Sequence, residues 1–375
     1  MRIIINQPRA SYFVGGAEMI SMQHARYFCE HGDSVVYVTI DPASIGYCLS
    51  QQYFDFKNTY NNVVNFVELD QDPSISDIYN IKPGESRLRW NVESLFFNRS
   101  LIKYLNQVGY SDCCVLSYYI LDCLYPGPHK NVLYLCGTPR QEDDFQGSFL
   151  RLYDKVVAIS DNVSEYWNTY SPCKIPIVYP GVDTARFRPY SRSIRQKGAI
   201  KKIRILYVGR LIARKNVGSL INAVNIVNDR LALSNRGIRA YLTVVGDGPE
   251  LANLRSIPCR YVRFVGECSN TEQFYANSDI FVSPSSYGEG VQGSLLEAMS
   301  TGLVCIASDT AVNRELLNHG RGVVLSGVDA SSVFDAIEDV CCNISQYNPI
   351  DTRKYICDNY SWNKSVGLLR KEILL

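Results

Sequence analysis

The sequence of 375 residues is poor in histidine and lacks spaced pairs of metal ligands. It contains only four histidines, and none of them has the spacing of a metal-ligand pair. Its thirteen cysteines are scattered along the chain without a C-x-x-C pair. We therefore expect no metal site, and we interpret the cysteines as small core residues of a protein kept in a reducing cytosol.

Long apolar runs and an excess of charge of either sign are also absent. No window reaches the length of a membrane span. The apolar run in Met1-Arg-Ile-Ile-Ile-Asn6 is too short for a signal peptide, so we expect a cytoplasmic protein. A net charge of +1 argues against nucleic acid as a partner.

What the sequence does contain is a glycine-rich turn between an apolar strand pattern and a helix pattern. The strand pattern is Asp279–Ser283, and apolar residues from Leu295 to Met299 fit one face of a helix. The turn contains Gly288, Glu289, Gly290 and Gly293, and a second glutamate, Glu297, lies in the first turns of the helix. Such a turn allows N–H groups to approach an anion. Alone, it is equally typical of a tight turn with solvated glutamates.

The order of elements indicates an α/β protein with two doubly wound domains. Strand, glycine turn, helix and strand follow each other from Arg2 to Ile40, with Gly15 and Gly16 in the turn. The same order begins again at the strand pattern 203–208. Between the two halves, residues 189–202 are basic and lack apolar periodicity, as in a linker. This basic segment is either simply solvated or lies near an anionic membrane surface.

In a doubly wound second domain, we expect two cationic side chains to lie near the glycine turn. Arg210 and Lys215 follow the strand 203–208, so they and the turn share the edge formed by the strands' carboxyl ends. Two cations with a helix N-terminus suit a dianionic diphosphate. We expect this site to lie in a cleft between the two domains.

Several motifs at fixed positions make the pattern specific. In the second half these are Gly209-Arg-Leu211 with Lys215-Asn216, Gly246-Asp-Gly-Pro249, Phe264-Val-Gly266, and Glu289-x7-Glu297 followed by Ala298-Met299. The first half adds Gly15-Gly-Ala-Glu18 and Pro180-Gly-Val-Asp183, and the end adds Tyr360-Ser-Trp362. The chain thereby resembles the GT-B fold glycosyltransferases of glycosyltransferase family 4, a large retaining family that uses nucleotide sugars. Residues 41–130 contribute almost nothing to the resemblance.

The resemblance implies a GT-B fold of two Rossmann-like domains facing a central cleft. Residues 1–188 would form the acceptor domain, 189–202 the linker and 203–357 the donor domain. A C-terminal helix of about 358–375 would return to the first domain. The implied activity is retaining, metal-independent transfer from a UDP- or GDP-sugar to a carbohydrate or lipid-linked acceptor, without a further cofactor. The expected setting is cell-surface polysaccharide or glycolipid synthesis, with weak peripheral membrane association at the inner face.

The resemblance also implies roles for single residues. Arg210 and Lys215 would bind the donor diphosphate and stabilise the leaving group, and Glu289 would contact the transferred sugar. Glu297 would hold the ribose hydroxyls, and the backbone around Cys268 would line the base pocket. The remaining donor-site residues are Gly15, Gly16, Gly246, Gly266, Gly290, Val291, Gln292 and Gly293. On the acceptor side we expect Cys136, Gly137, Thr138 and Arg140.

The sequence departs from the family pattern in two places. The family has an aromatic residue and a glycine where this chain has Val291 and Gln292, which leaves the donor sugar open. A histidine that the family places near the sugar is replaced here by Cys136 or Gly137. Two other functions remain: a nucleotide-sugar epimerase of the same fold, and a non-catalytic subunit that binds nucleotide sugars.

Overall fold

The chain forms two compact units in the computed structural model. The first unit consists of Met1–Pro180 together with Trp362–Leu375, and the second consists of Gly181–Ser361. The structure describes residues 1–83, 86–109, 112–125, 127–139, 141–189, 201–233, 237–268, 270–286 and 290–375, with the backbone alone for 141–144. Most of the predicted linker therefore lies outside the described residues, as do Arg140 and Glu289.

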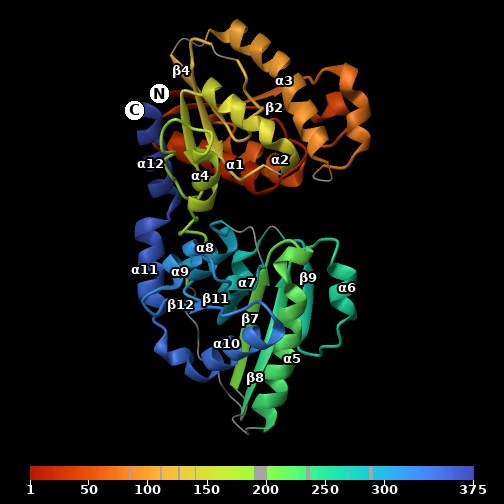
Figure 1. The fold of residues 1–375 in the computed structure, drawn as a ribbon, viewed down its shortest axis with the longest axis vertical. Helices are drawn as coiled ribbons and strands as arrows, with labels where there is room; N and C mark the ends of the chain where they lie inside the picture. Colours follow the sequence, from red (N-terminus) through yellow and green to blue (C-terminus); the bar gives the residue numbers. More distant parts are fainter. Residues whose placement is uncertain are drawn as a thin grey trace. The chain divides into compact units, whose positions relative to one another are not determined.

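The sheet of the first unit contains six parallel strands in the order β3-β2-β1-β4-β5-β6. They are β1 (Arg2–Asn6), β2 (Ser34–Ile40), β3 (Val64–Leu69), β4 (Cys113–Ser117), β5 (Lys130–Leu135) and β6 (Lys155–Ala158). The helices are α1 (Gly16–Glu30), α2 (Gln51–Tyr60), α3 (Arg87–Val108), α4 (Asp161–Asn168) and α12 (Trp362–Leu374) (Figure 1). Consecutive isoleucines of β1 are fully buried because helices cover both faces of the sheet.

The sheet of the second unit repeats this design in the order β12-β11-β10-β7-β8-β9. Its strands are β7 (Lys201–Val208), β8 (Ile238–Val245), β9 (Val262–Gly266), β10 (Ile280–Ser283), β11 (Val304–Ala307) and β12 (Gly322–Val324). Its α-helices are α5 (Val217–Leu233), α6 (Leu251–Ser256), α7 (Glu272–Ala276), α8 (Gly293–Ser300), α9 (Ala311–Leu317), α10 (Ala330–Asn343) and α11 (Pro349–Asn359). The two parallel sheets confirm the predicted α/β class with two doubly wound units.

The last helix, α12, belongs to the first unit although it ends the chain. Trp362 is buried there beside Tyr27 of α1, with ring centroids 6.3 Å apart. Arg370 pairs with Asp33 at 2.9 Å, and Lys155 pairs with Glu372 at 2.7 Å. An apolar anchor flanked by ion pairs therefore fixes α12 to the first unit.

Residues 41–80 are more regular than the sequence suggested. Two 3-10 helices, Pro42–Ile45 and Pro73–Asn80, flank α2 in this region. Their starts are capped locally, because Asp41 and Asp72 each accept a backbone N–H two residues ahead. The Ser50 hydroxyl caps α2 in the same way. Short capped helices have too little apolar periodicity to be recognised from sequence.

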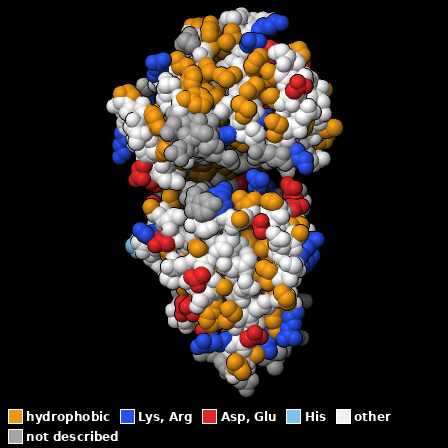
Figure 2. All heavy atoms as spheres, turned by 45° about the vertical axis from the view of Figure 1, so that its right-hand side comes forward, with side chains coloured by type: hydrophobic (Ala, Val, Ile, Leu, Met, Phe, Trp, Pro, Cys, Tyr) orange, Lys and Arg blue, Asp and Glu red, His pale blue; other side chains and the backbone are white. Residues whose placement is uncertain are grey.

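Some hydrophobic side chains of the first unit remain on its surface. Figure 2 shows them on the part that carries α1–α4 in Figure 1. The exposed ones include Phe54 on α2 and Leu88 and Leu95 on α3. Among the described residues, no helix is long and apolar enough to cross a membrane.

Candidate functional site

The carboxyl ends of four neighbouring strands in the second unit carry the predicted donor residues. The loops after β7, β8 and β9 are joined by backbone hydrogen bonds, from Gly209 N–H to Val245 O at 3.0 Å and from Gly246 N–H to Gly266 O at 2.8 Å. In an open α/β sheet this edge is where ligands bind. Cys268 lies just beyond Gly266 and is half-buried.

Close backbone approach explains why glycine follows β8. A Cβ atom on Gly246 would lie 2.0 Å from the carbonyl oxygen of Gly209, and one on Gly248 would lie 2.3 Å from that of Leu211. Gly246 also has a φ of +137°, which other residues rarely adopt. Leu211 N–H donates to Asp247 O at 2.9 Å. The loop after β8 thus supports the loop that carries Arg210.

Arg210 and Lys215 lie at the two ends of one short loop. The Tyr207 hydroxyl donates to the backbone oxygen of Arg210 at 3.1 Å, which fixes the start of the loop. Its end is a 3-10 turn, Ala213–Lys215, followed by Asn216 in the left-handed conformation with φ 54°. Arg210 is exposed and Lys215 is half-buried. The structure therefore holds the backbone firmly and presents both cations from one loop.

This cation loop touches the residues that lead into the glycine turn. Ser286 donates to the carbonyl oxygen of Arg214 twice, from its N–H at 2.8 Å and from its hydroxyl at 3.0 Å. Across the turn, the Ser283 hydroxyl donates to Gln292 Oε1 at 2.5 Å. Because Arg214 precedes Lys215, these contacts join the loop that carries the predicted diphosphate cation to the described residues on the β10 side of the turn. Tyr287–Glu289 lie outside the described residues, so the role of Glu289 stays a prediction.

Gln292 is buried and hydrogen-bonded within the fold, which the family pattern did not suggest. It is buried at 6% exposure and immediately precedes α8, where Gly290 and Val291 lead into it half-buried. Its side chain points back to β10 rather than being solvated. The residue that replaces the family's glycine thus ties the end of the turn to the strand from which the turn begins.

Glu297 lies on α8 with its carboxylate held in place. The Tyr275 hydroxyl donates to Glu297 Oε2 at 2.7 Å. Burial raises the pKa of Glu297 to about 7, although the Tyr275 hydrogen bond and the charge of Arg186 act in the opposite direction. Tyr275 packs edge-on against Phe187, with centroids 5.4 Å apart. The carboxyl group can therefore change charge near neutral pH.

In the glycine turn of the first unit, at the start of α1, one glycine is exposed to solvent and the other is hydrogen-bonded. Gly15 N–H donates to Glu18 Oε2 at 3.0 Å, so this amide is occupied within the helix cap. Gly16 is exposed, and a Cβ atom there would meet nothing within 4 Å. Glu18 is 4% exposed, and burial raises its pKa.

The predicted acceptor residues follow β5. Cys136 is half-buried, whereas Gly137 and Thr138 are exposed. Burial raises the pKa of the Cys136 thiol, and the carboxylates of Glu18 and Asp122 add to the effect. Trp167 Nε1–H donates to Gly137 O at 2.9 Å. Cys136 thus lies in the same electrostatic neighbourhood as Glu18, at the edge where the glycine turn lies.

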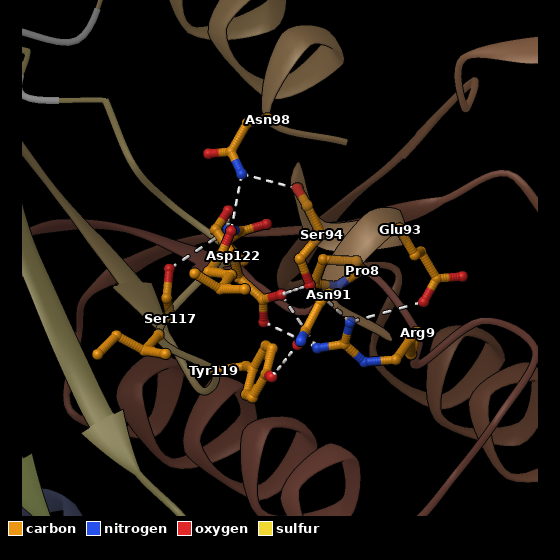
Figure 3. A network of polar contacts seen from close by, with 12 residues as sticks. Pro8, Arg9, Asn91, Glu93, Ser94, Asn98, Ser117, Tyr119 and Asp122 are labelled. Atoms are coloured by element: carbon orange, nitrogen blue, oxygen red, sulfur yellow. Dashed lines mark hydrogen bonds and ion pairs between the residues drawn. The ribbon is translucent and has the colours of Figure 1, made fainter. Parts of the chain in front are cut away.

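Sequence analysis missed a buried ionic network at this edge of the first unit, centred on Arg9 and Asp122 (Figure 3). In the sequence, the signal for this network was Asp122, a lone charge inside the apolar stretch 113–124.

Among the described residues, no group of three or more His, Cys, Asp or Glu side chains could hold a metal ion.

Comparison with known proteins gives one family match and many structural matches. Residues 202–343 match the family model "Glycosyl transferases group 1". An uncharacterized glycosyltransferase of Methanocaldococcus jannaschii is 28% identical over 61% of this chain and 64% of its own length. A GDP-mannose-dependent α-(1-6)-phosphatidylinositol monomannoside mannosyltransferase of Mycobacterium tuberculosis is 27% identical over 47% of this chain and 49% of its own. These matches thus span about half to two thirds of the relatives' lengths.

The structural match extends over nearly the whole chain. Anabaena HepE, solved in complex with UDP-glucose, superimposes with a TM-score of 0.70 at 15% identity and covers 99% of each chain. The chain has the GT-B fold, and its second unit is similar to the group 1 glycosyl transferases.

Proposed function

We propose that the protein is a retaining, metal-independent glycosyltransferase of glycosyltransferase family 4. It moves a sugar from a nucleotide diphosphate sugar to a hydroxyl acceptor in polysaccharide or glycolipid synthesis. The observation that carries the proposal is the contact between two loops of the second unit, where Ser286 bonds to the carbonyl of Arg214. The contact joins the loop that carries Lys215 to the segment that leads into the glycine turn, and a cation with a glycine turn at a helix N-terminus suits a diphosphate.

The residues of this edge suit the charge that develops during transfer. The bond between the anomeric carbon and the diphosphate oxygen breaks, and its electron pair leaves with the nucleoside diphosphate. Arg210 and Lys215 stabilise that growing negative charge. The acceptor oxygen bonds to the same face of the anomeric carbon, and its proton passes to a diphosphate oxygen, so no side-chain base is required.

Glu297 is assigned to the ribose and Glu289 to the transferred sugar. A carboxylate accepts two hydroxyl donors, and the Tyr275 hydrogen bond orients that of Glu297. Gly246, Gly266 and Cys268 would border the base, while Gly290, Val291, Gln292 and Gly293 would face the diphosphate and sugar. Gly16, with its exposed backbone, is assigned to the diphosphate as well.

The nucleotide is UDP or GDP in this proposal. The Mycobacterium relative is named for GDP-mannose, and HepE was solved with UDP-glucose. Acceptor residues are assigned to the segment 136–140 of the first unit. A cytoplasmic location with weak association at the inner face of a membrane completes the proposal.

A nucleotide-sugar panel tests this function. Thermal shift with UDP-, GDP-, ADP- and dTDP-sugars should reveal one stabilising donor, and that donor should be hydrolysed or transferred. Glu297→Ala should abolish the shift. Release of an epimerised donor without acceptor would instead favour an epimerase, and tight binding without turnover would favour a non-catalytic subunit. Absence of any nucleotide-sugar binding would refute all three.

A further inference from the structure

Three aromatic rings meet at the carboxyl edge of the first unit's sheet. Phe13 follows β1, Trp90 lies in the first turn of α3, and Tyr119 follows β4. The ring centroids of Phe13 and Trp90 are 5.9 Å apart, and those of Trp90 and Tyr119 are 6.5 Å apart, both edge-on. All three side chains are half-buried. We call them the aromatic face.

Two guanidinium groups pack against this aromatic face. The Cζ atom of Arg9 lies 5.3 Å from the Trp90 ring and 5.4 Å from the Tyr119 ring. The Cζ atom of Arg87 lies 5.3 Å and 5.6 Å from the same rings. These distances are within the range of cation–π attraction. Arg9 is fully buried, whereas Arg87 is half-buried beside the rings.

A buried network of polar side chains holds Arg9 in place (Figure 3). Arg9 donates to both carboxylate oxygens of Asp122 at 3.0 Å and to the Ser94 hydroxyl at 3.0 Å. Ser94 in turn donates to Asp122 at 2.6 Å, and Glu93 lies 3.6 Å from Arg9. The cation is therefore fixed both from the loop that follows β4 and from α3.

The rim of the face is held just as firmly by polar groups. The Tyr119 hydroxyl donates to Asn91 Oδ1 at 2.5 Å, and Gln146 donates to the Tyr119 hydroxyl at 2.7 Å. The Tyr119 ring is thus fixed before any ligand arrives, which lowers the entropic cost of binding.

Burying the ionised carboxylates of this network costs free energy. Burial raises the pKa of both Asp122 and Glu93, which shows that their ionised forms are penalised. Buried ion pairs often stabilise a fold no better than apolar side chains of the same volume. A purely structural role would therefore be served by a simpler core, whereas a binding surface gains from fixed geometry.

The aromatic face adjoins the glycine turn before α1. A Cβ atom on Gly15 would lie 3.4 Å from the Phe13 ring, so the two features are in contact. The turn is the part of the first unit that the proposed function assigns to the donor diphosphate. An acceptor bound on the aromatic face would therefore lie next to that turn.

We infer that the aromatic face, Phe13, Trp90 and Tyr119, is a subsite that binds a sugar ring of the acceptor. A pyranose presents a C–H face to an aromatic ring and hydroxyls to amides and guanidinium groups at its rim. The aromatic face offers this mixture. A lipid chain would need continuous apolar surface, which the flanking, half-buried Arg87 and Asn91 interrupt. This inference rests on the proposed transferase function and narrows its acceptor to a carbohydrate at this position.

Tryptophan fluorescence tests the inference without requiring turnover. The chain has three tryptophans, and Trp167 and Trp362 are only 2% and 7% exposed, so a ligand on the face should change the emission of Trp90. Hexoses and their methyl glycosides, titrated into the full chain with a saturating nucleoside diphosphate, should shift or quench the emission. Trp90→Phe should lose the response. A response to n-octanol but to no sugar would overturn the inference in favour of a lipid site.

Steady-state kinetics of two variants provide a second test of the acceptor subsite. Trp90→Ala should raise the acceptor KM roughly tenfold, as expected for loss of one aromatic contact. Leu88→Ala, an exposed change on the same helix, should leave the acceptor KM and the hydrolysis of the donor by water unchanged. An unaltered acceptor KM in Trp90→Ala would overturn the inference while leaving the transferase intact. A wild-type protein that turns over no nucleotide sugar would refute the proposed function, and the fluorescence titration would still decide on sugar binding.

Discussion

Tyr275 donates a hydrogen bond of 2.7 Å to the carboxylate of Glu297, joining α7 to α8 in the second unit. Burial nevertheless raises the pKa of Glu297 to about 7, far above the ordinary value of a glutamate. The carboxyl group assigned to the ribose is thus oriented by one neighbour but costly to ionise. Donor binding and protein stability should both depend on its proton.

Glu297 should make the protein less stable as the pH rises from about 4.5 to 7. In that window the unfolded chain has released the proton while the folded protein keeps it, so unfolding releases a proton and the free energy of unfolding falls with pH. Glu297→Gln removes this dependence and keeps an acceptor for Tyr275. Urea unfolding at pH 5, 6, 7 and 8 should show wild type losing roughly 1–3 kcal/mol relative to the variant. The same slope in both proteins would contradict the raised pKa, and the exposed Glu267→Gln serves as control.

Loss of either diphosphate cation should slow transfer without unfolding the protein. Lys215→Ala and Arg210→Ala should each lower kcat by about a hundredfold, because a preorganised charge at the leaving group is removed. Stability should change by no more than about 0.5 kcal/mol, since neither side chain is buried. Arg263→Ala, an exposed cation on β9, should leave kcat unchanged. Initial rates with saturating donor measure the effect, and equal rates in all three variants would exclude the assigned roles.

Gly246→Ala should destabilise the second unit and displace the cation loop. The added methyl group meets the Gly209 carbonyl at 2.0 Å, and the φ of +137° is unfavourable for alanine. We expect a loss of about 2 kcal/mol or more, measured by denaturant unfolding. In Gly367→Ala the methyl group meets nothing within 4 Å inside α12, so that variant should gain up to about 1 kcal/mol. Equal stability of the two variants would be incompatible with the described backbone.

The Arg9–Asp122 pair should show strong coupling in a double-mutant cycle. Arg9→Met or Asp122→Leu alone leaves an uncompensated buried charge and should cost about 3–5 kcal/mol. The double variant should be less destabilised than the sum of the two single variants, because both charges leave together. Chemical unfolding of the four proteins provides the coupling energy, and strict additivity would mean that the two groups do not interact.

The sequence could predict the parts of the fold whose signals are local. Apolar strands and glycine turns repeat in both halves, so the two doubly wound units and the edge carrying Arg210 and Lys215 followed from pattern alone. Short capped helices between residues 41 and 80 were missed, since each relies on a single cap. Helix α3 begins at Arg87, where the Ser86 side chain caps it.

Contacts between distant residues could not be predicted. Arg9 and Asp122 are separated by 113 positions, and no spacing rule connects them. The same holds for Glu297 and Tyr275, whose hydrogen bond depends on how α7 and α8 pack. The bond between Gln292 and Ser283 could not be predicted either, because it requires the register of β10 to be known. The role of Glu289 remains a prediction.

Calorimetric titration of UDP-glucose and GDP-mannose into wild type and Lys215→Ala tests the central claim most directly. If the loops that join Arg214 to Ser286 form a diphosphate site, one of these donors should bind wild type and bind Lys215→Ala at least tenfold more weakly. Equal affinity for both proteins, or no binding of either donor to wild type, would contradict the assignment of a donor site to this edge of the second unit.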